Sequence, residues 1–355
     1  MSLVTLILLA VGLAMLVCGA ELLVRGASAL AASLGISRLV IGLTVVAFGT
    51  SAPEMAVSVM AAWEGQAGIA LGNVVGSNIC NVLLILGLSA VVAPLVVARQ
   101  VVRLEVPIMI GTSLLLILFA LDGTLVRWEG GLLFAGVIGY TVWTIRRSRR
   151  ELRDLAEPGV AAPPASGRTR QLTEILSGLA LLVLGSKWLV DAAVIIARHL
   201  GVSDLVIGLT IIAVGTSLPE LATSVLASWR GERDIAVGNV VGSNIFNILS
   251  VLGLTALVAP AGLPVPPVAL TFDLPVMLAV AVACLPIFMA GYRINRWEGL
   301  LFIFYYVVYV LFLVLTAIGH DSRLLLGQAI IWFALPLTVL TLGISLWRHL
   351  HPSRH

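Results

Sequence analysis

Long apolar runs separated by short polar turns follow one another along almost the whole chain. Runs of about twenty apolar residues are typical of helices that cross a lipid bilayer. The pattern predicts eleven spans, at 3–32, 37–62, 69–93, 103–121, 128–146, 172–198, 204–228, 235–259, 270–291, 297–318 and 324–347. The first run starts without a basic segment or a cleavage site, so we interpret it as a span and not as a signal peptide.

The chain contains one unit twice. Residues 41–88 and 207–254 align at a constant offset of 166, and 31 of the 48 aligned positions are identical. The match continues outside this stretch, since RWEG occurs at both 127–130 and 296–299. Each unit has five spans, an odd number, so the second unit would enter the membrane in the opposite orientation. We therefore expect an all-α integral membrane protein with two inverted-topology five-helix repeats and one extra C-terminal span.

The repeat and the composition of the segment between its two copies predict the boundaries of the parts of the chain. The first repeat covers 1–146, a linker 147–170, the second repeat 171–318, and the extra span with its tail 319–355. The linker ends in EPGVAAPPASGR, a composition typical of flexible segments. If this linker is cytoplasmic, 16 basic residues lie at inside ends of spans and 3 at outside ends. Because cytoplasmic loops are rich in Arg and Lys, we expect the N-terminus outside and the C-terminus in the cytoplasm.

The composition narrows the class of protein further. The 355 residues are 60% hydrophobic and 11% charged, with a mean hydropathy of +1.10, whereas a soluble domain has about 25% charged residues. A net charge of +3 is too small to indicate a nucleic-acid partner. The three cysteines lie in apolar segments, and their odd number disfavours a disulfide framework or a zinc site. We expect a lipid bilayer around the chain and no cofactor; the oligomeric state stays open.

Each repeat places one acid inside an apolar span, Glu54 in GTSAPE and Glu220 in GTSLPE. A charge there is costly, so an intramembrane acid indicates a functional site. Pro53 has no N–H to donate to the carbonyl of Gly49, which leaves backbone oxygen free beside the acid. On a helix this acid shares one stripe with three residues that precede it, Ala47, Thr50 and Ser51.

The second motif, GNVVGSN, adds further oxygen ligands. Gly72 and Gly76 form a face that lets helices approach closely, and Ser77 and Asn81 lie one turn apart. The same types of residue recur in the second repeat as Ala213, Thr216, Ser217, Ser243 and Asn247. Hard cations such as Na⁺ and Ca²⁺ prefer these carboxylate, carbonyl, hydroxyl and amide oxygens. Other asparagines of the motif are interpreted as interhelical hydrogen-bonding groups: Asn73, Asn78, Asn239 and Asn244.

Both motifs, in the same order in both halves, resemble the alpha repeats of the cation/Ca²⁺ exchanger superfamily, most closely its prokaryotic Na⁺/Ca²⁺ exchanger branch. The resemblance covers about the first 318 residues. It implies secondary active antiport of Na⁺ for Ca²⁺ by alternating access in a prokaryotic plasma membrane, with spans one and six sliding across a fixed core. It also implies Glu54 and Glu220 as central Ca²⁺ ligands. Flanking Na⁺ sites would use Thr50, Ser51, Ser77, Thr216, Ser217 and Ser243, with the carbonyls of Ala47 and Ala213.

Some interpretations stay open. Some members of the superfamily carry Asp where Asn247 stands, whereas here both Asn81 and Asn247 are amides, so the coupling ion, the stoichiometry and K⁺ dependence are not fixed. H⁺-coupled exchange of Ca²⁺ or another divalent cation is the alternative within transport, and a channel is a second class. An enzyme is disfavoured, because the sequence contains neither HExxH nor GxSxG. Secondary expectations are an i,i+4 pair of Glu21 with Arg25 and an interfacial Glu105.

Overall fold

The computed structural model describes residues 3–155, 167–202, 204–207, 210–211 and 213–320, and four isolated positions, 322, 327, 339 and 343. Apart from those positions, the expected eleventh span lies outside the described residues, as does the middle of the expected linker. The described part is helical except for turns and four two-residue strands.

Apart from the segment Gly42–Val46, whose aligned residues are only partly described, the elements of the two halves follow one another in the same order. The first contains α1 (Leu3–Leu34), α2 (Arg38–Ile41), η1 (Gly42–Val46), α3 (Ala47–Thr50), α4 (Ala52–Trp63), α5 (Ala67–Cys80), η2 (Asn81–Leu86), α6 (Gly87–Val92), β1 (Leu95–Val96), η3 (Val101–Glu105), α7 (Val106–Ala120), β2 (Thr124–Leu125) and α8 (Arg127–Leu155), where η denotes a π-helical segment. The second contains α9 (Arg168–His199), α10 (Asp204–Ile207), α11 (Ala213–Gly215), α12 (Leu218–Trp229), α13 (Arg233–Phe246), η5 (Asn247–Leu252), α14 (Gly253–Val258), β3 (Leu263–Pro264), η6 (Ala269–Asp273), α15 (Leu274–Met289), β4 (Arg293–Ile294) and α16 (Arg296–Ala317).

Seven helices of the described part are long and apolar enough to cross a membrane, or eight if a bent pair counts as one span. The bent pair joins Arg38–Thr50 to Ala52–Trp63 at an angle of 43°, where the second span is expected. Helix α8 stands at the fifth expected span but is not among the seven. It continues to Leu155, with Arg147 and Glu151 paired at 2.7 Å one turn apart, so the first part of the expected linker is helical instead.

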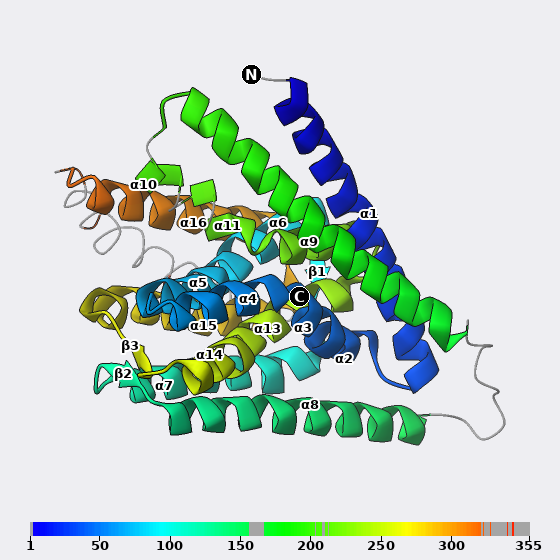
Figure 1. The fold of residues 1–355 in the computed structure, drawn as a ribbon. Helices are drawn as coiled ribbons and strands as arrows, with labels where there is room; N and C mark the ends of the chain where they lie inside the picture. Colours follow the sequence, from blue (N-terminus) through cyan, green and yellow to red (C-terminus); the bar gives the residue numbers. More distant parts are fainter. Residues whose placement is uncertain are drawn as a thin grey trace.

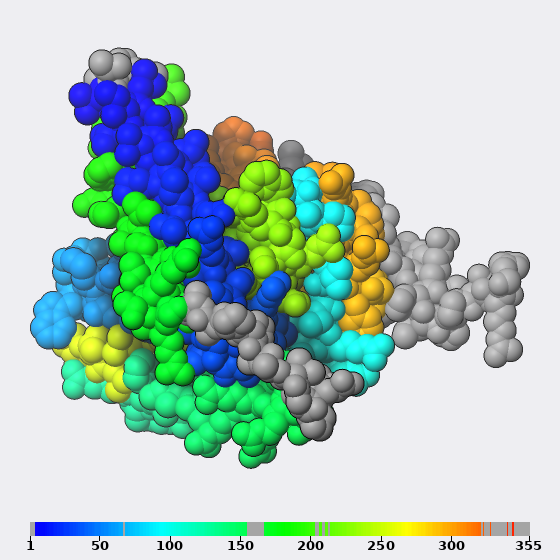
Figure 2. Space-filling view, turned by 90° about the vertical axis from the view of Figure 1, so that its right-hand side faces the viewer, coloured from blue at the N-terminus to red at the C-terminus, as the bar shows by residue number. Residues whose placement is uncertain are grey.

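The most buried spans form the centre of the bundle. Of the apolar windows in the continuous helices Gly68–Val92 and Arg233–Val258, 78% and 89% are buried. By contrast, α1 and α9 bury a third or less of theirs and run side by side, obliquely across the other helices (Figure 1). Figure 2 shows the N-terminal end of α1 (blue) projecting beyond the main body of the molecule. The core is thus the pair of motif-bearing spans, with α1 and α9 packed over it.

Two short strand pairs tie the halves together at their turns. Strand β1 pairs antiparallel with β4, and β2 pairs antiparallel with β3. Each pair therefore joins a strand of the first half to a strand of the second.

Candidate cation site

Both GTSxPE motifs break their helices at the second residue of the TS pair. In the first half α3 ends at Thr50, α4 begins at Ala52, and Ser51 between them has φ −81° and ψ 6°. In the second half Ser217 has nearly the same conformation, φ −87° and ψ 8°, before α12. Proline stands in the first turn of both following helices, where its missing N–H costs no helical hydrogen bond. The predicted break is therefore present in both copies.

These breaks place Glu54 and Glu220 in the first turns of α4 and α12, and neither residue is exposed to solvent. Each carboxylate accepts a hydrogen bond from the serine of the other half. Ser217 Oγ donates to Glu54 Oε1 at 3.0 Å, and Ser51 Oγ donates to Glu220 Oε1 at 3.1 Å. Since Ser51 is three residues before Glu54 and Ser217 three before Glu220, these bonds close a ring that brings the two acids together.

Ser77, from the second motif of the first half, joins the same cluster. Its Oγ atom lies 3.5 Å from Glu54 Oε1 and 3.0 Å from Ser217 Oγ. Three of the predicted ligands, two hydroxyls and one carboxylate, are thus in mutual contact.

Several acceptor oxygens of this region lack a hydrogen-bond partner although they are buried. Among the buried polar atoms without a partner in the described part of the chain, five belong to predicted site residues: Glu54 Oε2, Glu220 Oε2, Asn81 Oδ1, Asn247 Oδ1 and Ser243 Oγ. Buried polar atoms are nearly always paired, so such a group requires an explanation. Four of them are oxygens that only accept, and a cation is the partner that satisfies several such oxygens at once.

The two threonines of the GTS motifs, Thr50 and Thr216, contact asparagines that lie beside the two glutamates. Thr50 Oγ1 is 3.1 Å from Asn239 Oδ1 and 3.1 Å from the carbonyl oxygen of Val46, so it also bonds back to its own helix. Thr216 Oγ1 donates to Asn73 Oδ1 at 3.2 Å. Asn73 and Asn239 therefore make the interhelical hydrogen bonds that the sequence predicts.

Ser58 and Ser224 are supporting residues that the sequence analysis missed. Asn73 Nδ2 donates to Ser58 Oγ at 3.0 Å, and Asn239 Nδ2 donates to Ser224 Oγ at 2.9 Å. Both serines are fully buried. Their identity in the two aligned copies was a usable signal, because Ser58 and Ser224 are also separated by 166 positions.

The carbonyl of Ala47 is not free in this structure. It accepts from the backbone N–H of Ser51 at 3.0 Å and lies 3.4 Å from Thr50 Oγ1. At the second break the N–H of Ser217 donates to Val214, and not to the carbonyl of Ala213. The role of the two alanine carbonyls as ligands stays a prediction.

The surroundings of the two GNVVG segments differ. Gly238 and Gly242 are buried, and a Cβ atom on them would lie 2.8 Å from the carbonyl oxygen of Leu39 and 2.7 Å from that of Leu43. The α2–η1 segment thus packs directly on the α13 backbone. The matching Gly72 is exposed, and Gly76 is half-buried. Among the described residues, the expected close helix approach at the small-residue face is therefore found for the second copy and not for the first.

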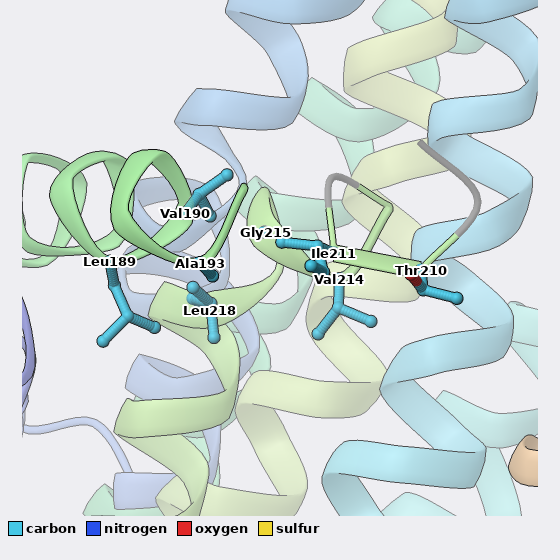
Figure 3. A pocket seen from close by; sticks show the side chains of 8 residues that line it. All are labelled: Leu189, Val190, Ala193, Thr210, Ile211, Val214, Gly215 and Leu218. Atoms are coloured by element: carbon cyan, nitrogen blue, oxygen red, sulfur yellow. The ribbon is translucent and has the colours of Figure 1, made fainter. Parts of the chain in front are cut away.

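The two threonines differ in burial in the same way, since Thr216 is half-buried whereas Thr50 is fully buried. Residues of α9 and of the stretch around the second helix break border an open apolar pocket (Figure 3). Thr210 is the one polar side chain among its eight lining residues, which are Leu189, Val190, Ala193, Thr210, Ile211, Val214, Gly215 and Leu218. Thr216 and Gly72 are thus more accessible than their counterparts Thr50 and Gly238.

A helical membrane protein with buried, unpaired carboxylate and amide oxygens between two matching halves belongs to the class that handles cations. The comparison with known proteins specifies the family. The chain matches the family model described as sodium/calcium exchanger protein over residues 4–146 and 172–315. The chain belongs to this family, whose members are transporters, so its activity is transport and not catalysis.

Individual relatives cover nearly the whole chain. It is 43% identical over 313 residues to the putative antiporter CaxA of Alkalimonas amylolytica, covering 86% of this chain and 98% of the relative. It is 34% identical over 346 residues to the sodium/calcium exchanger MaX1 of Methanosarcina acetivorans, covering 87% and 98%. A structure of the sodium-calcium exchanger NCX_Mj superimposes with a TM-score of 0.75 at 31% identity, covering 87% of this chain and 98% of that one.

Proposed function

We propose that this protein is a secondary antiporter that exchanges Na⁺ for Ca²⁺ across a prokaryotic plasma membrane by alternating access. The observation that carries the proposal is the cluster of unpaired, buried acceptor oxygens around Glu54 and Glu220. Two carboxylates balance the charge of one Ca²⁺ ion, and the same oxygens suit Na⁺ ions that compete for them. Membership of the exchanger family and the similarity to MaX1 and NCX_Mj support this choice of ions.

In this proposal Glu54 and Glu220 are the central Ca²⁺ ligands, and the neutral oxygens complete that site and the flanking Na⁺ sites. The neutral ligands are Thr50, Ser51, Ser77, Asn81, Thr216, Ser217, Ser243 and Asn247, with the carbonyls of Ala47 and Ala213. The contacts of Ser51, Ser77 and Ser217 with the carboxylates support the arrangement.

The proposed architecture is a pair of inverted five-span repeats, 1–146 and 171–318, joined by a cytoplasmic linker and followed by an eleventh span. Reciprocal contacts support it. The bond from Ser51 to Glu220 has its counterpart in the bond from Ser217 to Glu54, and the β1–β4 pair has its counterpart in the β2–β3 pair. The family model also matches two separate segments of the chain, one in each proposed repeat. In the proposed orientation the N-terminus is outside and the C-terminus is cytoplasmic.

Uptake of ⁴⁵Ca²⁺ into proteoliposomes loaded with Na⁺ and diluted into choline tests the function. We expect uptake driven by the outward Na⁺ gradient and none when choline replaces Na⁺ inside. Uptake that persists without Na⁺ and follows a pH gradient instead would assign the protein to H⁺-coupled exchange. Flux without any counter-ion would assign it to the channels.

The variants Glu54→Gln and Glu220→Gln belong to the same assay. Each keeps the shape of the side chain but removes one of the two charges that balance Ca²⁺, so each is expected to abolish Na⁺-driven uptake. Near-normal uptake by either variant would exclude its acid from the ion site.

A further inference from the structure

Four asparagines, Asn78, Asn81, Asn244 and Asn247, meet at the centre of the bundle, and none is more than 3% exposed. They come from the two most buried spans, where α5 passes into η2 and α13 passes into η5. Their bonds cross between the halves. Asn81 Nδ2 donates to Asn244 Oδ1 at 3.0 Å, and Asn247 Nδ2 donates to Asn78 Oδ1 at 3.0 Å.

The orientation of the Asn78 amide is set by its other partners. Its Nδ2 donates to the backbone carbonyl oxygen of Asn244 at 3.2 Å and lies 3.6 Å from Met277 Sδ. A carbonyl oxygen and a thioether sulfur can only accept, so the nitrogen side of the Asn78 amide must face them. The oxygen side then faces Asn247, which can bond to it only through Nδ2. The Asn247 Oδ1 atom is consequently turned away, and it is one of the unpaired buried oxygens.

The Asn244 amide is fixed in a matching way. Its Nδ2 lies 3.4 Å from Met109 Sδ, which leaves its Oδ1 to accept from Asn81 Nδ2. The Asn81 Oδ1 atom is likewise turned away and unpaired. Each half thus orients the amide of the other half.

The geometry points to a positioning role for Asn78 and Asn244 in cation binding: they hold the Asn247 and Asn81 side chains with the amide oxygen, and not the amide nitrogen, toward the cation. This inference rests on the proposed function. An amide that turns over presents two N–H groups, which carry partial positive charge and repel a cation. Neither Asn78 nor Asn244 offers an oxygen of its own, because each Oδ1 is already bonded to the amide that it orients.

Equilibrium binding of ⁴⁵Ca²⁺ to the purified, detergent-solubilised protein tests the positioning role. Asn78→Leu and Asn244→Leu remove the orienting acceptor. Each is expected to weaken Ca²⁺ binding by about tenfold, because one amide oxygen is no longer held toward the cation. A loss of packing alone could have the same effect, so rescue decides between the two explanations.

The rescue uses the symmetry of a carboxylate, which presents oxygen whichever way it turns. In the Asn247→Asp background, Asn78→Leu is expected to change Ca²⁺ affinity little, because no amide remains to be oriented. In the Asn81→Asp background, the same Asn78→Leu change keeps its full effect, since the Asn247 amide is still present. The reverse holds for Asn244→Leu, which only Asn81→Asp rescues. Such a double-mutant cycle isolates the coupling within each pair.

The crossed pattern distinguishes the outcomes. If Asn78→Leu costs the same affinity in both aspartate backgrounds, or nothing in the wild type, the positioning role is overturned. Should the leucine variants fail to elute as folded protein, Asn78→Ala and Asn244→Ala enter the same cycle, because alanine also lacks the acceptor. A wild-type protein that binds Ca²⁺ without Na⁺-driven uptake contradicts the exchange but not the positioning. A wild-type protein that binds no Ca²⁺ overturns both.

Discussion

At the scale of single residues, the two oxygens of each carboxylate have different surroundings. Oε1 of Glu54 and Oε1 of Glu220 accept a serine hydroxyl of the other half, while both Oε2 atoms are left without a protein partner. The serine bond fixes the rotation of the carboxylate, and in the proposed site Oε2 then binds the ion. In that proposal serine orients an acid as well as offering an oxygen.

Removing one of these hydroxyls should weaken Ca²⁺ binding without abolishing transport. A hydrogen bond contributes about 0.5–1.5 kcal/mol, so Ser217→Ala and Ser51→Ala should each raise the Ca²⁺ concentration for half-maximal uptake roughly two- to tenfold. Ser177→Ala is the matched control and should leave uptake unchanged, because Ser177 Oγ bonds back to the carbonyls of Thr173 and Glu174 on its own helix, α9. An unaltered Ca²⁺ dependence in both site variants would contradict the orienting role.

Sequence spacing predicts which residues of one motif share a helix face, but not what they contact in the other half. The break at Ser51 and Ser217 follows from local chemistry, so it was predictable. The partner of Glu21 was not. It pairs with Arg230 at 2.7 Å, and not with Arg25, because the turn after α12 lies beside α1.

The partners of Glu105 were not predictable either, for the same reason. This residue is fully buried, and it accepts from Tyr140 and Gln100, each at 2.8 Å. A position at the start of an apolar run indicates the depth of a residue in the membrane, but not which helix covers it. Here α8 supplies Tyr140.

At the scale of elements, α1 and α9 touch through glycine. Cβ atoms added to Gly19 and Gly178 would lie 2.8 Å from each other's carbonyl oxygens, and Gly12 and Gly185 form a second pair at 2.9 and 2.8 Å. Side chains larger than hydrogen do not fit between the two backbones at these points. Close approach through glycine is a common way to pack helices in lipid, where burial of apolar surface gives little driving force.

Alanine at these contacts should separate the helices. Gly19→Ala and Gly178→Ala are expected to destabilise the protein by about 1–3 kcal/mol each, the usual cost of overpacking, and to lower the midpoint of thermal unfolding in detergent. Gly111→Ala is the control, since no heavy atom of the described residues lies within 4 Å of a Cβ there and alanine favours helix. An equal fall in all three variants would show that the α1–α9 contact is not special.

The sequence predicts the existence of elements better than their limits. Eight of the eleven expected spans coincide with a helix, or with the bent pair, that is long and apolar enough to cross a membrane in the described part of the chain. The end of α8 was misjudged because RRSRRELRDL, although polar, forms helix with its own i,i+4 pair. The π-helical segments that start at Asn81 and Asn247 were not predicted either. Such bulges depend on how neighbouring side chains insert, which apolar periodicity does not record.

At the scale of the whole molecule, two copies of nearly the same sequence have different surroundings. The α2–η1 segment covers the α13 backbone, and Arg38 pairs with Glu232 at 2.8 Å at that end. The corresponding face of α5, around Gly72, is exposed. No reading of the sequence could give this difference, because the repeats themselves are almost equivalent. The proposed alternating access requires an asymmetry of this kind, since one route to the site must close while the other opens.

Accessibility of the two matching threonines tests that asymmetry. Thr216 is half-buried, whereas Thr50 is fully buried against α13. If the Thr216 side faces outward, a membrane-impermeant thiol reagent added outside intact cells should label Thr216→Cys and spare Thr50→Cys. Both changes are nearly isosteric, and both are made in a protein whose Cys18, Cys80 and Cys284 are replaced by alanine. Labelling of both variants after denaturation provides the control. Faster labelling of Thr50→Cys from outside would contradict either the proposed orientation or the greater accessibility of Thr216. Labelling of Thr50→Cys at the cytoplasmic face of inverted vesicles would distinguish these two explanations.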